Sequence, residues 1–197
     1  MSRDPLRLTE TATAGVGAHA QQDLTWRARW RAELYTGKHW KNPDGSLNTP
    51  DRIVDASGNL LVYGGASLMW EYAMGNGSTA AASAKKYINA TAALGVGNST
   101  VAAVNTQKVL SGGSQLVKAL TGGFPTHTTG STVAGAAQVV YKSTFGLTEG
   151  NFAWQEFGLF NKAATTASQR MLTRKVQNLL TKTSAATATF TLTLTLA

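Results

Sequence analysis

The sequence predicts a mainly β protein: an antiparallel β-sandwich, jelly-roll or immunoglobulin-like, with one short helix and an extended N-terminal arm. Two observations support this prediction. Short segments of alternating or β-branched residues are separated by glycine-rich turns, which is typical of a sandwich. The chain also closes on residues 187–197, where threonines alternate strictly with apolar residues, as in a strand with one apolar face. We expect the apolar residues to pair into the core and the threonine ladder to lie outside.

Composition divides the chain into an arm and a single domain. Residues 1–22 hold small polar residues with little to bury, so they indicate an extended arm that only a partner could order. Residues 23–197 predict one β-sandwich domain. Within it, 23–58 supply an N-terminal strand and loops, 59–83 a short helix, and 84–197 the main sandwich. No apolar stretch approaches transmembrane length, so no membrane contact is expected.

Residues 24–35, LTWRARWRAELY, alternate strictly and predict a strand. One face is apolar and includes Trp26 and Trp30. The other face carries three arginines: Arg27, Arg29 and Arg31. A helix is the alternative, because Trp26, Trp30 and Leu34 also recur every four residues.

The next segments predict turns and the helix. The run NPDG at 42–45 is a strong turn signal within 36–52. Residues 65–74 predict the helix, because apolar residues share one face and Gly75 stands where a helix-terminating glycine belongs.

Four further segments indicate strands by their β-branched or aromatic residues and their glycine boundaries: 85–100, 114–125, 131–146 and 151–161. Within the first, GVGNST at 95–100 indicates a tight turn between β elements and not a phosphate loop, because it lacks the lysine of a Walker A motif. Residues 168–182 fit both a helix and a strand, and periodicity alone favours the helix. The predicted core comprises Trp154, Phe157, Leu159, Phe160, Val176, Phe190, Leu192 and Leu194.

The distribution of acids argues against an enzyme. None of the ten carboxylates lies between Glu71 and Glu149 or after Glu156. Catalysis by paired carboxylates needs two acids in one cleft. Glu156 is expected to be a structural acid, paired with an arginine such as Arg170 or Arg174. The three histidines have no metal-ligand spacing and cysteine is absent, so we expect no catalytic residue, cofactor or metal.

The net charge is +8, which permits contact with nucleic acid but does not establish it. Arginines interleaved with tryptophans could hold phosphates and stack on bases. In a strand, however, the two residue types face opposite ways. We therefore expect Arg27, Arg29 and Arg31 to face an acidic partner protein, and nucleic-acid binding is not expected.

Four stretches carry a resemblance to known proteins: NLLVYGGASLMWEYAMG (59–75), YINATAALGVGNSTVAAVNTQKVL (87–110), STFGLTEGNFAWQEFGLFN (143–161) and MLTRKVQNLLTKTSAATATFTLTLTLA (171–197). In order and spacing, these resemble a family of tailed-bacteriophage virion structural proteins over about two thirds of the chain. Thr173 replaces the usual asparagine, and Leu180 stands where the family has a glycine. The resemblance implies a β-sandwich protein that is an accessory part of the particle. It also implies that residues 168–182 form a strand and not a helix.

The function expected from this resemblance is a non-enzymatic structural protein located in the virion. It would be a decoration, cement or accessory protein on the capsid surface, bound through its arm and sandwich edges to the major capsid protein or other virion proteins, in many copies or as a homo-oligomer. The alternatives are a neck, tail or receptor-binding fibre protein, as a trimer, and an envelope-degrading hydrolase. The expected partner-binding residues are Arg27, Arg29, Arg31, Thr191, Thr193 and Thr195.

Overall fold

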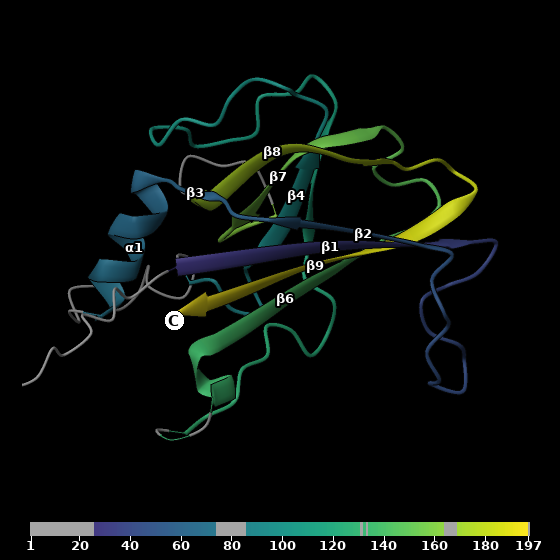
Figure 1. The fold of residues 1–197 in the computed structure, drawn as a ribbon, viewed down its shortest axis with the longest axis horizontal. Coiled ribbons are helices and arrows are strands. Elements are labelled where there is room, and N and C mark those ends of the chain that lie inside the picture. Colours follow the sequence, from purple (N-terminus) through teal and green to yellow (C-terminus); the bar gives the residue numbers. More distant parts are fainter. Residues whose placement is uncertain (1–25, 74–85, 131, 133, 164–168, 197) are drawn as a thin grey trace, which may run out of the picture.

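Two antiparallel sheets lie face to face in the computed structural model, which describes residues 26–73, 86–130, 132, 134–163 and 169–196 (Figure 1). The predicted mainly β sandwich is therefore confirmed. The first sheet has the order β2-β1-β9-β6, from β1 (Trp26–Thr36), β2 (Arg52–Ser57), β6 (Gln138–Phe145) and β9 (Ala186–Leu196). The second has the order β3-β8-β7-β4-β5, from β3 (Leu60–Leu61), β4 (Ala93–Gly97), β5 (Gln115–Ala119), β7 (Ala153–Phe160) and β8 (Met171–Thr181). The arm expected over 1–22 lies outside the described residues.

The strand predicted at 24–35 is a central strand of the first sheet. β1 pairs with the C-terminal strand β9 along its whole length, from Trp26 opposite Leu196 to Thr36 opposite Ala186. The sandwich therefore extends beyond 84–197, because β1 and β2 form half of this sheet. The two most clearly alternating segments of the sequence thus pair with each other, and their apolar faces enter the same core.

Aromatic side chains fill the space between the sheets. Trp30 lies against Phe157 and Phe190, with ring centroids 4.9 and 5.6 Å apart. Trp154 contacts Phe145 and Phe190 from the opposite sheet. Aromatic pairs in this arrangement add to the free energy gained from burial.

Of the eight predicted core residues, seven are buried and Val176 is only half-buried. The pairing of β7 with β8 shifts between Trp154 and Glu156, where Trp154 opposes Leu180 and Glu156 opposes Val176. Two extra residues of β8 therefore lie within this interval. The irregularity breaks the alternation on which the prediction for Val176 rested.

Residues 171–181 form a strand, as the resemblance implies and against the helical periodicity. The prediction of a tight turn at GVGNST (95–100) is also corrected. Gly95 and Gly97 lie within β4 and not in a turn. A Cβ atom at Gly95 would stand 2.6 Å from Phe160 Cε2, and one at Gly97 would stand 2.5 Å from Glu156 Oε1. The glycines therefore make room for two side chains of β7.

The predicted helix is present as α1 (Tyr63–Ala73), at one end of the sandwich. Gly65 lets it approach β8, because a Cβ atom there would be 2.3 Å from Leu172 Cα. The proposed terminating Gly75 lies outside the described residues. No helix in the described part of the chain has both the length and the apolar character needed to span a bilayer.

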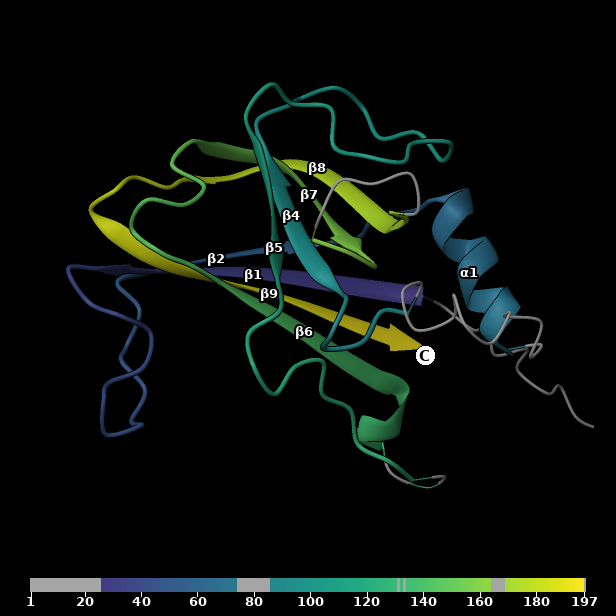
Figure 2. The ribbon, with the colours of Figure 1, turned by 180° about the vertical axis from the view of Figure 1, so that it is seen from behind.

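The outer faces of the two sheets differ (Figures 1 and 2). On the second sheet, an apolar cluster joins the strands to the start of α1 and to the long loop 98–114; it comprises Val62, Ala93, Leu110, Phe160 and Met171. On the first sheet, the connection 37–51 covers only one end, where the Thr187 hydroxyl donates to the Lys38 carbonyl at 2.8 Å. The rest of that face carries the predicted partner-binding residues.

Candidate partner-binding face

The structure brings all six predicted partner-binding residues together. β1 and β9 run antiparallel, and their outward side chains pair across the strands: Arg27 with Thr195, Arg29 with Thr193, and Arg31 with Thr191. We call these six residues the arginine–threonine face. Because side chains alternate along a strand, the same register that buries Trp30 and Leu192 turns the arginines and threonines outward.

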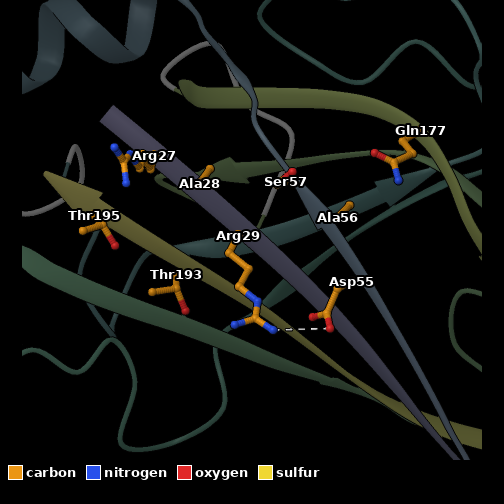
Figure 3. Close-up of a pocket in the computed structure, with 9 residues that line it drawn as sticks. All are labelled: Arg27, Ala28, Arg29, Asp55, Ala56, Ser57, Gln177, Thr193 and Thr195. Carbon is orange, nitrogen blue, oxygen red and sulfur yellow. Dashed lines mark hydrogen bonds and ion pairs between the residues drawn. The ribbon is translucent and has the colours of Figure 1, made fainter. Parts of the chain in front are cut away.

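A groove of about 480 Å³ runs over this face (Figure 3). Its lining residues come from β1, β2, β8 and β9: Arg27, Ala28, Arg29, Asp55, Ala56, Ser57, Gln177, Thr193 and Thr195. Ala28 and Ala56 are buried in the core, and the other seven lining residues carry guanidinium, carboxylate, hydroxyl or amide groups. Arg31 and Thr191 continue the face beyond the groove.

Asp55 of β2 is the acid that offsets part of this positive charge. Its carboxylate accepts from Arg31 Nε at 3.1 Å and from Arg29 Nη2 at 3.4 Å. The hydrogen bond from Arg31 is the main cause that holds the pKa of Asp55 below its usual value. Arg27 forms no ion pair with any described residue. The face therefore keeps an excess of positive charge, concentrated at Arg27 and Arg29.

The threonine ladder is only partly outside, which corrects the sequence-based expectation. Thr191, Thr193 and Thr195 are half-buried and reach the surface, whereas Thr187 and Thr189 are buried. The connection 37–51 covers Thr187, as its bond to Lys38 shows.

Thr189 is buried beside an acid that the sequence did not single out. Its hydroxyl donates to Glu33 Oε2 at 2.8 Å, and the Tyr35 hydroxyl donates to the same oxygen at 3.0 Å. Burial, with the bond to Glu33, raises the pKa of Tyr35 to about 12. The accessible part of the ladder is therefore limited to the three threonines of the arginine–threonine face.

Lys142 of β6 lies opposite Thr191 at the far side of the face. Its Nζ stands 5.1 Å from the centre of the Trp40 ring and 5.5 Å from that of Phe124. Such cation–π contacts restrain the ammonium group. Nothing in the sequence alone brings these three residues together, because they come from three separate segments.

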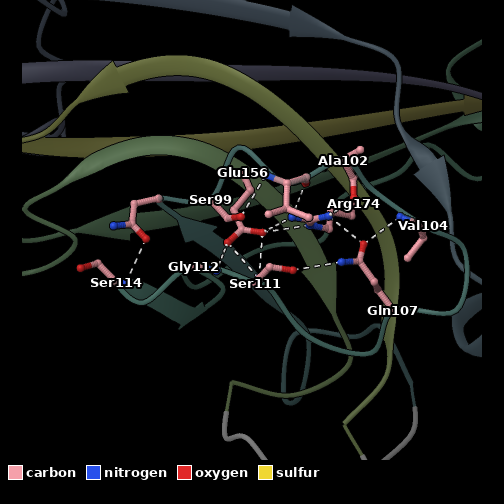
Figure 4. A network of polar contacts seen from close by, with 11 residues as sticks. Ser99, Ala102, Val104, Gln107, Ser111, Gly112, Ser114, Glu156 and Arg174 are labelled. Carbon is pink, nitrogen blue, oxygen red and sulfur yellow. Dashed lines mark hydrogen bonds and ion pairs between the residues drawn. The ribbon is translucent and has the colours of Figure 1, made fainter.

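The second polar cluster of the molecule lies under loop 98–114 and is buried (Figure 4). Glu156 and Arg174 form an ion pair at 2.6 Å, with both side chains 0% exposed. The guanidinium uses all five of its donors: two bonds reach Glu156, and the others reach the Val101 and Ala102 carbonyls and the Gln107 side chain. We call this cluster the Arg174 network.

The carboxylate of Glu156 is equally satisfied. It accepts from the backbone N–H of Ser111 at 3.0 Å and of Gly112 at 2.6 Å. The sequence-based expectation that Glu156 pairs with an arginine is confirmed, with Arg174 as the partner. The network ties both ends of the loop to β7 and β8, so its geometry is that of a structural clamp.

Glu149 belongs to a different ion pair. It binds Lys118 Nζ and accepts from the Gly146 N–H at 2.8 Å, and these contacts hold its pKa below the usual value, with the Gly146 bond as the larger cause. Within the described ranges, no three histidine, aspartate or glutamate side chains gather in a way that could hold a metal ion.

An apolar cavity of about 260 Å³ opens at the α1 end of the sandwich, between the first sheet and the helix. Trp26, Met69 and Leu194 are among its lining residues. The indole N–H of Trp26 is buried there without a hydrogen-bond partner. Its walls offer apolar packing and little polar chemistry.

Comparisons with protein-family models, with curated proteins and with solved structures found no match to this chain.

Proposed function

We propose that this chain is a non-enzymatic structural protein of a tailed-bacteriophage virion, which attaches to the capsid surface through its arginine–threonine face. The observation that carries the binding role is a row of outward arginines on the first sheet, in which Arg27 has no ion-pair partner among the described residues. Arginine suits contacts with carboxylates across an interface. The virion setting comes from the resemblance of residues 59–197 to such proteins.

The surroundings of the acids support a structural role over a hydrolase. Glu156 is buried in the Arg174 network and accepts from four N–H donors, two of the backbone and two of Arg174, so its oxygens are committed to the fold. Glu149 is committed to Lys118 and Gly146. A hydrolase of the paired-carboxylate type would need these two acids to face one cleft. Here they join different partners.

The test measures attachment to particles assembled without this chain. Reversal of all three arginines to glutamate, as R27E/R29E/R31E, should reduce co-sedimentation of the purified protein with such particles by at least about tenfold. Three exposed cations away from the face provide a matched control with the same change in net charge: K41E/R52E/K108E.

The control variant should co-sediment like the unmodified protein. Equal binding by the two triple variants would contradict the proposed attachment face. A particle reconstruction then separates the capsid from the neck, tail or fibre location: density on the capsid surface supports the decoration role, and density confined to the neck or tail supports the alternative.

A further inference from the structure

We infer that the arginine–threonine face binds an extended acidic segment of its partner in which the carboxylates alternate, as acid–x–acid. This inference rests on the proposed function and deepens it, because it specifies the chemistry and the spacing of the partner.

The spacing follows from the register of β1. Arg27 and Arg29 are two residues apart on one strand, so their Cα atoms lie about 6.6–6.8 Å apart. An extended partner segment presents every second side chain on the same face with the same period. Acids at alternate positions can therefore meet both arginines at once. When the two acids are adjacent in sequence, one carboxylate points away and only one arginine is met.

The neighbouring strand supplies hydroxyl donors along the same line. Thr195 lies opposite Arg27 and Thr193 opposite Arg29, in strands that are about 4.8 Å apart. Each arginine–threonine pair thus offers a guanidinium and a hydroxyl to one incoming carboxylate. Both pairs line the groove, so the donors face an accessible space (Figure 3).

Asp55 shows how this face holds a carboxylate. It reaches in from β2 and accepts from both Nε and Nη2 of Arg31, at 3.1 and 3.3 Å. Arg29 contributes a longer contact of 3.4 Å, and its side chain remains 65% exposed. The β2 side of the face thus already has an acid, while the end at Arg27 has none among the described residues. A partner carboxylate completes that end.

The same pattern disfavours duplex DNA. Tight binding to DNA needs several cations that each neutralise a phosphate. Here Asp55 forms ion pairs with two of the three arginines, Arg29 and Arg31, and neutralises part of their charge. The remaining positive charge matches one or two carboxylates.

The experiment compares two cyclised hairpin peptides of identical composition for binding to the full chain: TETETT, with two alternate acids, and TTEETT, with two adjacent acids, on the recognition strand. The alternating peptide should bind about fivefold more tightly, by isothermal titration calorimetry at low salt. Because both peptides carry the same charge, general attraction to a basic protein cancels. The variant R27E/R29E should lose the preference, and its thermal unfolding should match that of K41E/R52E.

Asp55→Asn provides a test with the opposite sign. It removes the internal carboxylate and frees Arg29 and Arg31, so the alternating peptide should bind about two- to fivefold more tightly than to the unmodified chain. Weaker binding to D55N would overturn the inference.

Two outcomes separate this inference from the proposed function. Equal affinity for the two peptides would overturn the inference, even if R27E/R29E/R31E still failed to bind particles. A preference for the alternating peptide, with unchanged attachment of that triple variant to particles, would support the inference and contradict the proposed attachment. Tighter binding to a DNA duplex than to the alternating peptide, with a steep dependence on salt, would also overturn it.

Discussion

The two outer faces of this sandwich both pair arginine with carboxylate, but in opposite surroundings. On the second sheet, Arg174 and Glu156 are fully buried, and Glu156 together with loop 98–114 satisfies every donor of the guanidinium. On the first sheet, Arg29 and Arg31 share Asp55 with side chains that are 65% and 41% exposed. We call the second sheet's outer face closed, because every donor of its arginine is used within the fold, and the first sheet's outer face open, because its arginines remain exposed.

The difference shows that burial determines how much an arginine–carboxylate pair contributes to the stability of the fold. A buried ion pair tolerates no missing partner, because an uncompensated charge away from water is strongly destabilising. An exposed pair contributes little to stability, because water and salt screen it. The same residue types therefore hold a loop on one face and remain exposed to solvent on the other. Four changes test this comparison, from the largest expected effect to the smallest.

Arg174→Met should be the most damaging. It leaves the Glu156 carboxylate buried without its cation and removes the bonds to the loop carbonyls, so unfolding free energy should fall by about 3–5 kcal/mol. Urea denaturation measures the loss. The free energy of unfolding of a domain is about 5–15 kcal/mol, so this loss would be a large fraction of the total.

The double variant E156L/R174M is the control. Removing both charges avoids the buried orphan, so this protein should be more stable than Arg174→Met alone. A double variant that is less stable than the single one would show that the backbone bonds, and not the charge, dominate the Arg174 network.

Gly97→Ala tests how tightly the network is packed. The added Cβ would lie 2.5 Å from Glu156 Oε1, and this side chain cannot retreat without losing its bonds. We expect a loss of about 1–3 kcal/mol, typical of overpacking. Gly113→Ala is the matched control, because nothing lies within 4 Å of its Cβ position. Equal melting temperatures for the two variants would contradict the close fit.

Alternation explains which of these features the sequence could predict. It assigned β1 and β9 their inward and outward residues, and so predicted the arginine–threonine face. The scarcity of acids in the second half of the chain led to the pairing of Glu156 with an arginine. The first prediction depends on a local pattern, and the second depends on a choice among few possible partners. A single sequence contains the information for both.

The features that the sequence missed depend on contacts between distant segments. The connection 37–51 covers Thr187, although in the sequence this residue has the same alternating pattern as the other threonines of the ladder. Gly97 resembles a turn glycine until Glu156 is placed beside it. Asp55 moderates the arginine row only because β2 pairs with β1. Periodicity carries no information on which loop or strand covers a given face.

The pair between Glu149 and Lys118 is intermediate, with side chains that are 33% and 34% exposed. Glu149→Gln should lower stability at pH 7 by about 1 kcal/mol. The pKa of Glu149 is depressed in the folded state, so its contribution is present above the unfolded pKa, about 4.3, and is lost as pH falls through the folded value. The stability difference between the two proteins should therefore shrink between pH 5 and pH 2.5. A constant difference over that range would exclude a role for the charge.

Arg31→Ala should have the smallest effect on folding. Its bonds to Asp55 lie at the surface, and exposed pairs measured by double-mutant cycles contribute about 0.2–1 kcal/mol. The cycle of Arg31→Ala with Asp55→Asn should give a coupling energy in this range, and 0.5 M salt should reduce it, because the Debye length is then only about 4–5 Å. The variant should unfold nearly as the unmodified protein does. A coupling as large as that between Arg174 and Glu156, or one insensitive to salt, would mean that water is excluded from this face too. The arginines would then serve the fold, and the distinction between a closed and an open face would fail.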